Sequence, residues 1–253
     1  MDLEGFEPST SSVRLKRAPN CATGPQPGKL YLMGEAYVKA KGAAGTNHAL
    51  LTTAMSFFHI LSLDGGGIRG LFTAILLERL EAARPGLLAQ VDLFAGASTG
   101  GILALGLAAG RTPSQARELY ELRGRQVFAN ARWDNWRDLG HAVRAQYSNA
   151  YLKKVLTQEF GDMKLGDLPH HVLIAAFDLE NDPANPPPMR TWKPKFFHNF
   201  PGHDTDAHEK VVDVALRTSA APSYFPIYQG YIDGGVVAGN PSMTALAQNK
   251  FMA

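Results

Sequence analysis

The sequence has only one cysteine, Cys21, among its 253 residues. A single cysteine excludes a disulfide framework within the chain and any metal site built from cysteines alone. The histidines are scattered without a recognisable ligand spacing, so we expect neither a metal site nor a cofactor. Such low cysteine usage agrees with a reducing compartment, and we expect a cytoplasmic protein.

Long hydrophobic runs and an excess of one charge are also lacking. No stretch approaches the roughly 18 consecutive apolar residues of a membrane span, so any membrane contact is expected to be peripheral. The 25 Lys and Arg nearly balance the 23 Asp and Glu. The basic cluster of Arg14, Lys16 and Arg17 lies in a Ser- and Pro-rich arm. This charge balance argues against nucleic acid as a partner.

The chain is long enough for one sizeable domain with its own core. Residues 1–54 are rich in Gly, Pro, Ser and Thr without sustained periodicity, which predicts a poorly structured leader. Met55 comes directly before the first convincing strand, so the leader is expected to be dispensable. We therefore predict one folded domain over residues 55–253.

Two strand-turn-helix units open this domain. Residues 57–63 form a short apolar run, residues 64–70 a glycine-rich turn, and residues 71–84 an apolar pattern of helical spacing. The unit then repeats, with a strand at 91–95, a turn at 96–100 and a helix at 101–109. Two consecutive units of this kind predict an α/β fold with a parallel sheet covered by helices.

The second turn, Gly96-Ala97-Ser98-Thr99-Gly100, has the form of a nucleophile elbow. Small flanking residues permit a strained turn between strand and helix that exposes the serine. The positive end of the following helix would stabilise negative charge developing beside Ser98. A glycine-rich turn with no catalytic role can have the same sequence, but the strand before it and the helix after it favour a catalytic role.

The first turn, residues 64–70, admits two functional interpretations. The unshielded N–H groups of its glycines could bind an oxyanion, yet the same glycines fit a dinucleotide fingerprint. That fingerprint expects an acidic residue at the end of the second strand, whereas Glu81 lies inside the first predicted helix. Asp64, directly before the glycines, would also oppose a pyrophosphate.

Asp233 follows a predicted strand at residues 227–232 and precedes Gly234 and Gly235. The carboxyl ends of strands are where open α/β sheets place functional groups. An Asp-Gly pair is also an ordinary turn, so the position alone is ambiguous. No histidine follows Asp233, which excludes the Ser, Asp, His order with Asp233 as the acid.

A conventional triad would need other residues of the chain. It would combine an acid, Asp178 or Asp182, with one of three later histidines. These histidines are His198, His203 and His208. They occur in a predicted polar loop, and we expect them at the surface.

Together, the residue 64–70 loop, the residue 96–100 elbow and the Asp233-Gly234-Gly235 turn resemble, in this order, the signatures of the patatin-like phospholipases. The run from Thr218 to Pro226 is also similar, and the resemblance covers about residues 57–245. It implies a three-layer α/β/α sandwich with a mostly parallel central sheet, and a Ser-Asp dyad that forms an acyl-enzyme.

The resemblance also implies roles for individual residues. Ser98 would be the nucleophile and Asp233 its base, which needs an apolar surround to act at neutral pH. Gly96 and Gly100 would shape the elbow, and Gly234 and Gly235 the turn of the dyad. The oxyanion-hole loop would comprise Gly65, Gly66, Gly67, Arg69 and Gly70.

The implied function is a serine lipid acyl hydrolase that acts on lipid or phospholipid esters at a membrane or micelle surface. The alternatives are a triad esterase, a dinucleotide-dependent oxidoreductase and a catalytically silent scaffold. The presence of both Ser98 and Asp233 disfavours the scaffold. We further expect residues 125–147, with Trp133 and Trp136, to form a lid at the lipid interface, or else to close the core.

Overall fold

The computed structural model describes residues 57–129, 149–180 and 191–249. The expected leader, most of the expected lid with both of its tryptophans, and Asp182 lie outside these ranges. The strands are β1 (Ile60–Leu63), β2 (Leu93–Ala97), β3 (His171–Asp178), β4 (Lys193–His198) and β5 (Tyr231–Asp233). The α-helices are α1 (Gly70–Ala83), α2 (Thr99–Ala108), α3 (Pro113–Ala129), α4 (Asn149–Phe160), α5 (Val211–Thr218), α6 (Gly235–Ala238) and α7 (Ser242–Asn249). Short 3-10 turns cover η1 (Gly67–Arg69), η2 (Leu88–Gln90) and η3 (Leu165–Asp167).

The sheet has the order β1-β2-β3-β4, and β1, β2 and β3 run parallel. The two opening strand-turn-helix units predicted from the sequence are therefore present as β1-α1 and β2-α2. Strands β4 and β5 both pair with β3 in the antiparallel direction. The result is a mixed sheet with a parallel portion, consistent with the predicted α/β/α class.

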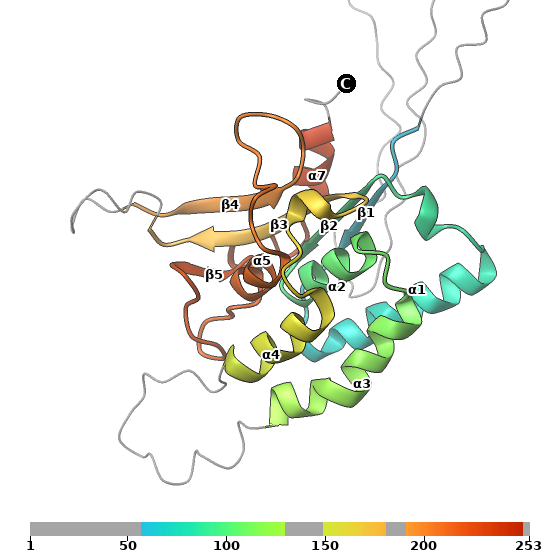
Figure 1. Cartoon of the computed structure of the whole chain (residues 1–253), viewed down its shortest axis with the longest axis horizontal. Coiled ribbons are helices and arrows are strands. Elements are labelled where there is room, and N and C mark those ends of the chain that lie inside the picture. Colours follow the sequence, from blue (N-terminus) through green and yellow to red (C-terminus); the bar gives the residue numbers. More distant parts are fainter. Residues whose placement is uncertain (1–56, 130–148, 181–190, 250–253) are drawn as a thin grey trace, which may run out of the picture.

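Helices cover both faces of this sheet (Figure 1). Side chains alternate along the strands, so Phe94 and Ile174 enter the core shared with α1, α2, α4 and α5. Leu93 and Leu173 point to the opposite face, where they meet Ala245 of α7. Because alternate residues of one strand face opposite sides, each strand packs against helices on both faces, which gives three layers.

Strand β5 joins β3 on the same edge as β2. Strand β2 pairs with β3 as far as Ala97, which lies opposite Ala175. Strand β5 arrives from the other direction and ends at Asp233, opposite Ala176. The two strands thus meet nearly end to end, and the residues at their tips become neighbours.

The predicted strand over residues 227–232 is wrong in its first half. Tyr228 and Tyr231 face each other across a tight turn. Gln229 and Gly230 have φ values of 51° and 82°, in the left-handed region that a strand cannot contain. The regular strand therefore begins only at Tyr231, and its apolar predecessors belong to the turn.

Two glycines of α2 provide a matched test of the packing. A Cβ at Gly100 would overlap the carbonyl oxygen of Leu63, whereas a Cβ at Gly106 meets nothing within 4 Å. We expect Gly100→Ala to lower the free energy of unfolding by about 1–3 kcal/mol. Gly106→Ala should raise it by about 0.5–1 kcal/mol, because alanine loses less backbone entropy. Urea unfolding of both variants checks this, and a Gly100→Ala variant as stable as wild type would contradict it.

Candidate active site

Ser98 occupies a strained turn between β2 and α2. Its φ of 55° and ψ of −128° lie in a region that residues other than glycine rarely adopt. The flanking residues must be small. A Cβ at Gly96 would overlap the carbonyl of Gly100, and one at Gly100 would overlap the carbonyls of Leu63 and Asp64. This geometry is that of a nucleophile elbow.

The Ser98 hydroxyl donates a hydrogen bond of 2.6 Å to Oδ2 of Asp233. The other carboxylate oxygen, Oδ1, accepts the Gly235 N–H at 2.6 Å. Only 6% of Asp233 is exposed to solvent. Burial raises the pKa of this carboxyl above its ordinary value, while the hydrogen bonds from Ser98 and Gly235 oppose that rise.

The acid and the first histidine considered for a triad lie far from each other. His198 pairs with Leu173 near the start of β3, whereas Asp178 ends that strand. The two positions are five residue steps apart along the strand, roughly 16 Å. Within the described ranges, the hydroxyl of Ser98 has a hydrogen bond to Asp233 and none to a histidine.

The expectation that these histidines are surface residues is wrong for His198. It belongs to β4 rather than to a loop, and it is buried beside the ring of Phe200. Its Nε2 lies 3.6 Å from a carboxylate oxygen of Asp204. His203 and His208 are exposed, as expected.

The glycine loop lies beside Ser98, but its N–H groups differ in what they bind. The Gly65 N–H donates to the carbonyl of Gly239, and the Gly70 N–H to carbonyls of its own turn. The Gly66 N–H donates a hydrogen bond of 3.2 Å to the hydroxyl oxygen of Thr99, the residue after Ser98. Gly67 has a φ of 57°, which glycine adopts without strain. Gly67 is therefore the best-placed candidate to face a ligand, and Gly66 could do so by releasing its hydrogen bond to Thr99.

Arg69 lines the cavity and also holds the loop. Its Nε donates to the carbonyl of Gly66 at 3.3 Å, and its backbone N–H binds the same oxygen at 3.1 Å. At the opposite end of the loop, the Asp64 carboxyl hydrogen-bonds the side chain of Asn240. Burial raises the pKa of Asp64, which this hydrogen bond opposes. The loop is thus tied to its own turn and to the segment after α6.

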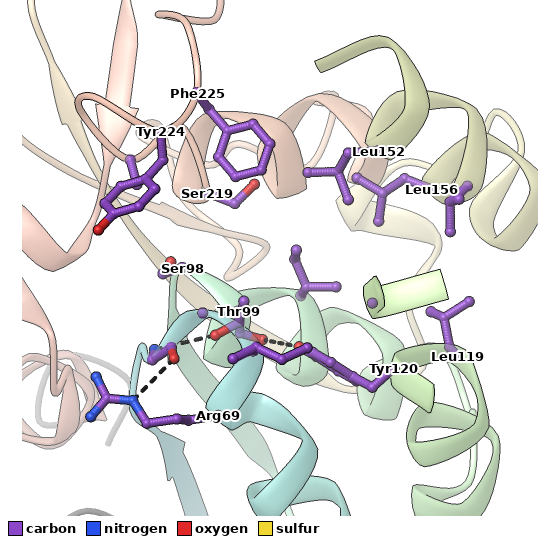
Figure 2. Close-up of a pocket in the computed structure, with 17 residues that line it drawn as sticks. Arg69, Ser98, Thr99, Leu119, Tyr120, Leu152, Leu156, Ser219, Tyr224 and Phe225 are labelled. Atoms are coloured by element: carbon purple, nitrogen blue, oxygen red, sulfur yellow. Dashed lines mark hydrogen bonds between the residues drawn. The ribbon is translucent and has the colours of Figure 1, made fainter. Parts of the chain in front are cut away.

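An apolar cavity of about 550 Å³ extends from Ser98 between α2, α3 and α4 (Figure 2). Ligand pockets in proteins commonly enclose about 300–1,000 Å³. Leu152 and Leu156 of α4 form one wall and Tyr120 of α3 another, with Phe225 nearby. The Tyr120 hydroxyl donates to the Thr99 carbonyl at 3.3 Å, so its polar end is satisfied. The interior of the cavity suits a hydrocarbon chain.

Sequence reasoning missed Thr218, the last residue of α5. Its hydroxyl oxygen accepts the Ser98 N–H at 2.9 Å, although 120 residues separate them. The resemblance includes this threonine in the run that ends at Pro226, but nothing in the sequence indicates that its hydroxyl reaches the elbow. Only the packing of α5 against β3 and α2 brings them together.

The described part of the chain contains neither a cluster of metal ligands nor a membrane-spanning helix. No three or more His, Cys, Asp or Glu side chains there come close enough to hold a metal ion. No helix of that part has both the length and the hydropathy needed to cross a membrane.

Comparison with known proteins agrees with this geometry. The family model for patatin-like phospholipases matches residues 61–246. Over 206 residues the chain is 38% identical to a cGAMP-activated phospholipase of Pseudomonas aeruginosa, covering 78% of this chain and 58% of that protein. It is 36% identical to a cGAMP-activated phospholipase of Vibrio cholerae, covering 74% and 56% of the two chains. It is 29% identical to patatin-like protein 4 of Arabidopsis thaliana, covering 76% and 53%. The chain thus spans less than two thirds of the length of these relatives.

The burial of the Asp233 carboxyl predicts how the stability of the protein depends on pH. Because its pKa is raised on folding, Asp233 contributes most to stability below its unfolded pKa of about 3.9, and that contribution is lost as pH rises through the folded pKa. At pH 7 the native state therefore carries the cost of a buried charge. We expect Asp233→Asn to raise the melting temperature at pH 7, with the gain disappearing toward pH 4.

Asp206→Asn is the matched control, because Asp206 is also buried but pairs with Lys195 at 2.6 Å. Removing its charge leaves the lysine without its partner and should lower the melting temperature. Thermal unfolding of both variants between pH 4 and 8 makes the comparison. Equal losses at pH 7 would show that the Asp233 charge does not destabilise the fold.

Proposed function

The chain belongs to the patatin-like phospholipase family, and from this premise we propose that it hydrolyses fatty-acyl esters of lipids through a Ser98–Asp233 dyad. The observation that carries the proposal is the 2.6 Å hydrogen bond from Ser98 to Asp233 at the end of an apolar cavity. A nucleophile and its base within this distance are ready for proton transfer.

In the proposed reaction, Asp233 accepts the hydroxyl proton while Oγ of Ser98 attacks the ester carbonyl carbon. The tetrahedral intermediate collapses, the ester C–O bond breaks, and Asp233 gives the proton to the departing alcohol oxygen. The acyl group remains on Ser98. Water then attacks this acyl-enzyme with Asp233 as base, releasing the fatty acid and returning the proton to Oγ.

The oxyanion of the intermediate needs N–H donors that can face it. We assign this role to the N–H groups of Gly67 and Gly66, with support from the N-terminal end of α2. The Gly66 N–H would exchange its 3.2 Å hydrogen bond to the Thr99 hydroxyl for one to the oxyanion. One such donor is worth about 3 kcal/mol in comparable sites. In this proposal, Gly65 and Gly70 shape the loop, because their N–H groups already bind carbonyls, and Arg69 fixes its orientation.

The cavity favours a long acyl chain over a small or charged substrate. Its depth is lined by aliphatic side chains of three helices, while its polar residues gather near Ser98. The aliphatic lining residues are Ile102, Leu119, Leu152, Val155 and Leu156. An acyl chain in this space would bring its carbonyl carbon to Oγ of Ser98, and the headgroup would stay outside.

We also propose that the enzyme works at an anionic lipid surface. Ile68 lines the cavity, and Phe72 and Leu76 follow it at helical spacing along α1, all three exposed. Phe72 is 74% exposed, unusual for so large an apolar side chain. This exposed apolar stripe lies beside the site and could enter a bilayer interface.

The charges around the stripe suit the same surface. Arg69 and Arg79 are exposed on the same turn-and-helix segment. The nearby acids are engaged elsewhere. Glu78 pairs with Arg117 at 2.8 Å, and Glu81 accepts the N–H groups of Gly86 and Leu88. The stripe is therefore flanked by two exposed cations, of whose neighbouring acids Glu78 is paired with Arg117 and Glu81 faces backbone N–H groups of the turn after α1.

The competing functions have less support. A dinucleotide-dependent oxidoreductase would need the residue 64–70 loop for a pyrophosphate, but that loop lies against the elbow, and Glu81 caps the turn after α1. A silent scaffold would have no need for a strained serine hydrogen-bonded to a buried carboxylate.

Ser98→Ala tests the nucleophile. We expect hydrolysis of p-nitrophenyl esters to fall at least about a thousandfold, because the attacking oxygen is gone. Labelling by a fluorophosphonate probe should disappear, while the melting temperature stays close to that of wild type. His203→Ala and His208→Ala serve as controls that should retain activity. Retained turnover in Ser98→Ala, or a dead histidine variant, would overturn the dyad.

Phe72→Ser tests the lipid surface. Removing the exposed ring should depress hydrolysis of anionic phospholipid vesicles about tenfold and leave a monomeric short-chain ester unaffected, since only the first assay needs docking. Met243→Ser is a matched control, because Met243 is 70% exposed on α7, across the sheet from α1. Equal effects of the two variants, or equal losses on both substrates, would contradict the docking role.

A further inference from the structure

Thr218 is completely buried, and its hydroxyl takes part in two hydrogen bonds. The hydroxyl donates to the carbonyl of Ala175 in β3 at 2.5 Å. A hydroxyl has only one proton, so toward the Ser98 N–H, 2.9 Å away, it can act only as an acceptor. The side chain therefore links the middle of β3 to the nucleophile elbow in a single defined orientation.

The backbone around Thr218 holds the other half of the dyad. Its carbonyl accepts the Gly234 N–H at 3.1 Å, and the carbonyl of Ala220, two residues on, accepts the Asp233 N–H at 3.0 Å. The segment from Thr218 to Ala220 thus binds Ser98 through a side chain and Asp233 through the main chain. Ser98 and Asp233 are therefore both hydrogen-bonded to the same three-residue segment.

Neither Ser98 nor Asp233 lies in the middle of a long regular element. Ser98 has a strained backbone, and Asp233 ends a strand of only three residues. Ala175 of β3 contacts the neighbours of both residues. It pairs with Ala97, and its carbonyl accepts the hydrogen bond from the Thr218 hydroxyl. The same carbonyl packs so closely on Gly234 that a Cβ at Gly234 would overlap it.

We infer that Thr218 is a positioning residue whose hydroxyl sets the distance between Ser98 and Asp233 for reaction. The inference rests on the proposed function, since it concerns the same dyad. Thr218 does not touch the substrate. It orients the Ser98 backbone, which directs Oγ toward Oδ2 of Asp233 at 2.6 Å. Misplacement of a reacting group by about 1 Å can cost roughly a hundredfold in rate.

The methyl group and the hydroxyl of Thr218 can be tested separately. The methyl packs against α2 at Gly101, while the hydroxyl makes the two hydrogen bonds. Thr218→Val keeps the shape and removes the hydroxyl, and Thr218→Ser does the reverse. If the hydroxyl positions the dyad, serine should preserve activity and valine should not.

The experiment measures kcat and KM on a monomeric ester, the rate of fluorophosphonate labelling and the melting temperature. We expect Thr218→Val to lower kcat and the labelling rate about 10- to 100-fold with KM within twofold. Thr218→Ser should stay within about threefold of wild type. Val212→Ala, in the buried face of the same helix, supplies a variant destabilised without loss of this hydroxyl.

Three results would overturn the inference. They are an unchanged kcat in Thr218→Val, an equal loss in Thr218→Ser, and an equal loss in Val212→Ala assayed below its melting temperature. If Thr218→Val does not fold, Thr218→Cys replaces it, and a kcat equal to that of Thr218→Ser would count against the hydroxyl. A wild-type chain inactive toward both ester and probe would instead overturn the proposed function, and this inference with it.

Discussion

The site depends on the way two strands share one edge of β3. Strand β2 runs along this edge to Ala97, and β5 runs in the opposite direction to Asp233, so that their ends occupy adjacent register positions. The 2.6 Å hydrogen bond between Ser98 and Asp233 closes the gap between them. Residues 135 positions apart in the sequence become neighbours without a long loop to place either one.

This placement has an electrostatic cost. The carboxylate of Asp233 is almost fully removed from water, and burial raises its pKa. The same burial makes it a better proton acceptor at neutral pH than an exposed aspartate would be. Two donors, the Ser98 hydroxyl and the Gly235 N–H, offset part of the cost. In the proposed mechanism, the fold therefore loses some stability at Asp233 in exchange for a better base, as is common at functional sites.

Local patterns in the sequence were enough to predict β1-α1, β2-α2 and the elbow, because each depends on residues close together in the chain. The antiparallel direction of β4 and β5 was not predictable from such patterns, since it depends on pairing with distant β3. The burial of His198 and the short extent of β5 were missed for similar reasons. The sequence also did not indicate which N–H groups of the loop, such as those of Gly65 and Gly70, bind carbonyls in the fold. The hydrogen bond from Ser98 to Thr218 depends on tertiary packing and cannot be predicted from residue spacing.

The proposed reaction passes through an acyl group on Ser98. This intermediate can be tested by quenching the protein in acid during turnover of a slowly deacylating ester and mapping the adduct by peptide mass spectrometry. We expect the mass of the acyl group on the peptide that contains Ser98, without any added metal or cofactor. An adduct on another residue, or continued turnover with no adduct at Ser98 at any quenching time, would contradict it.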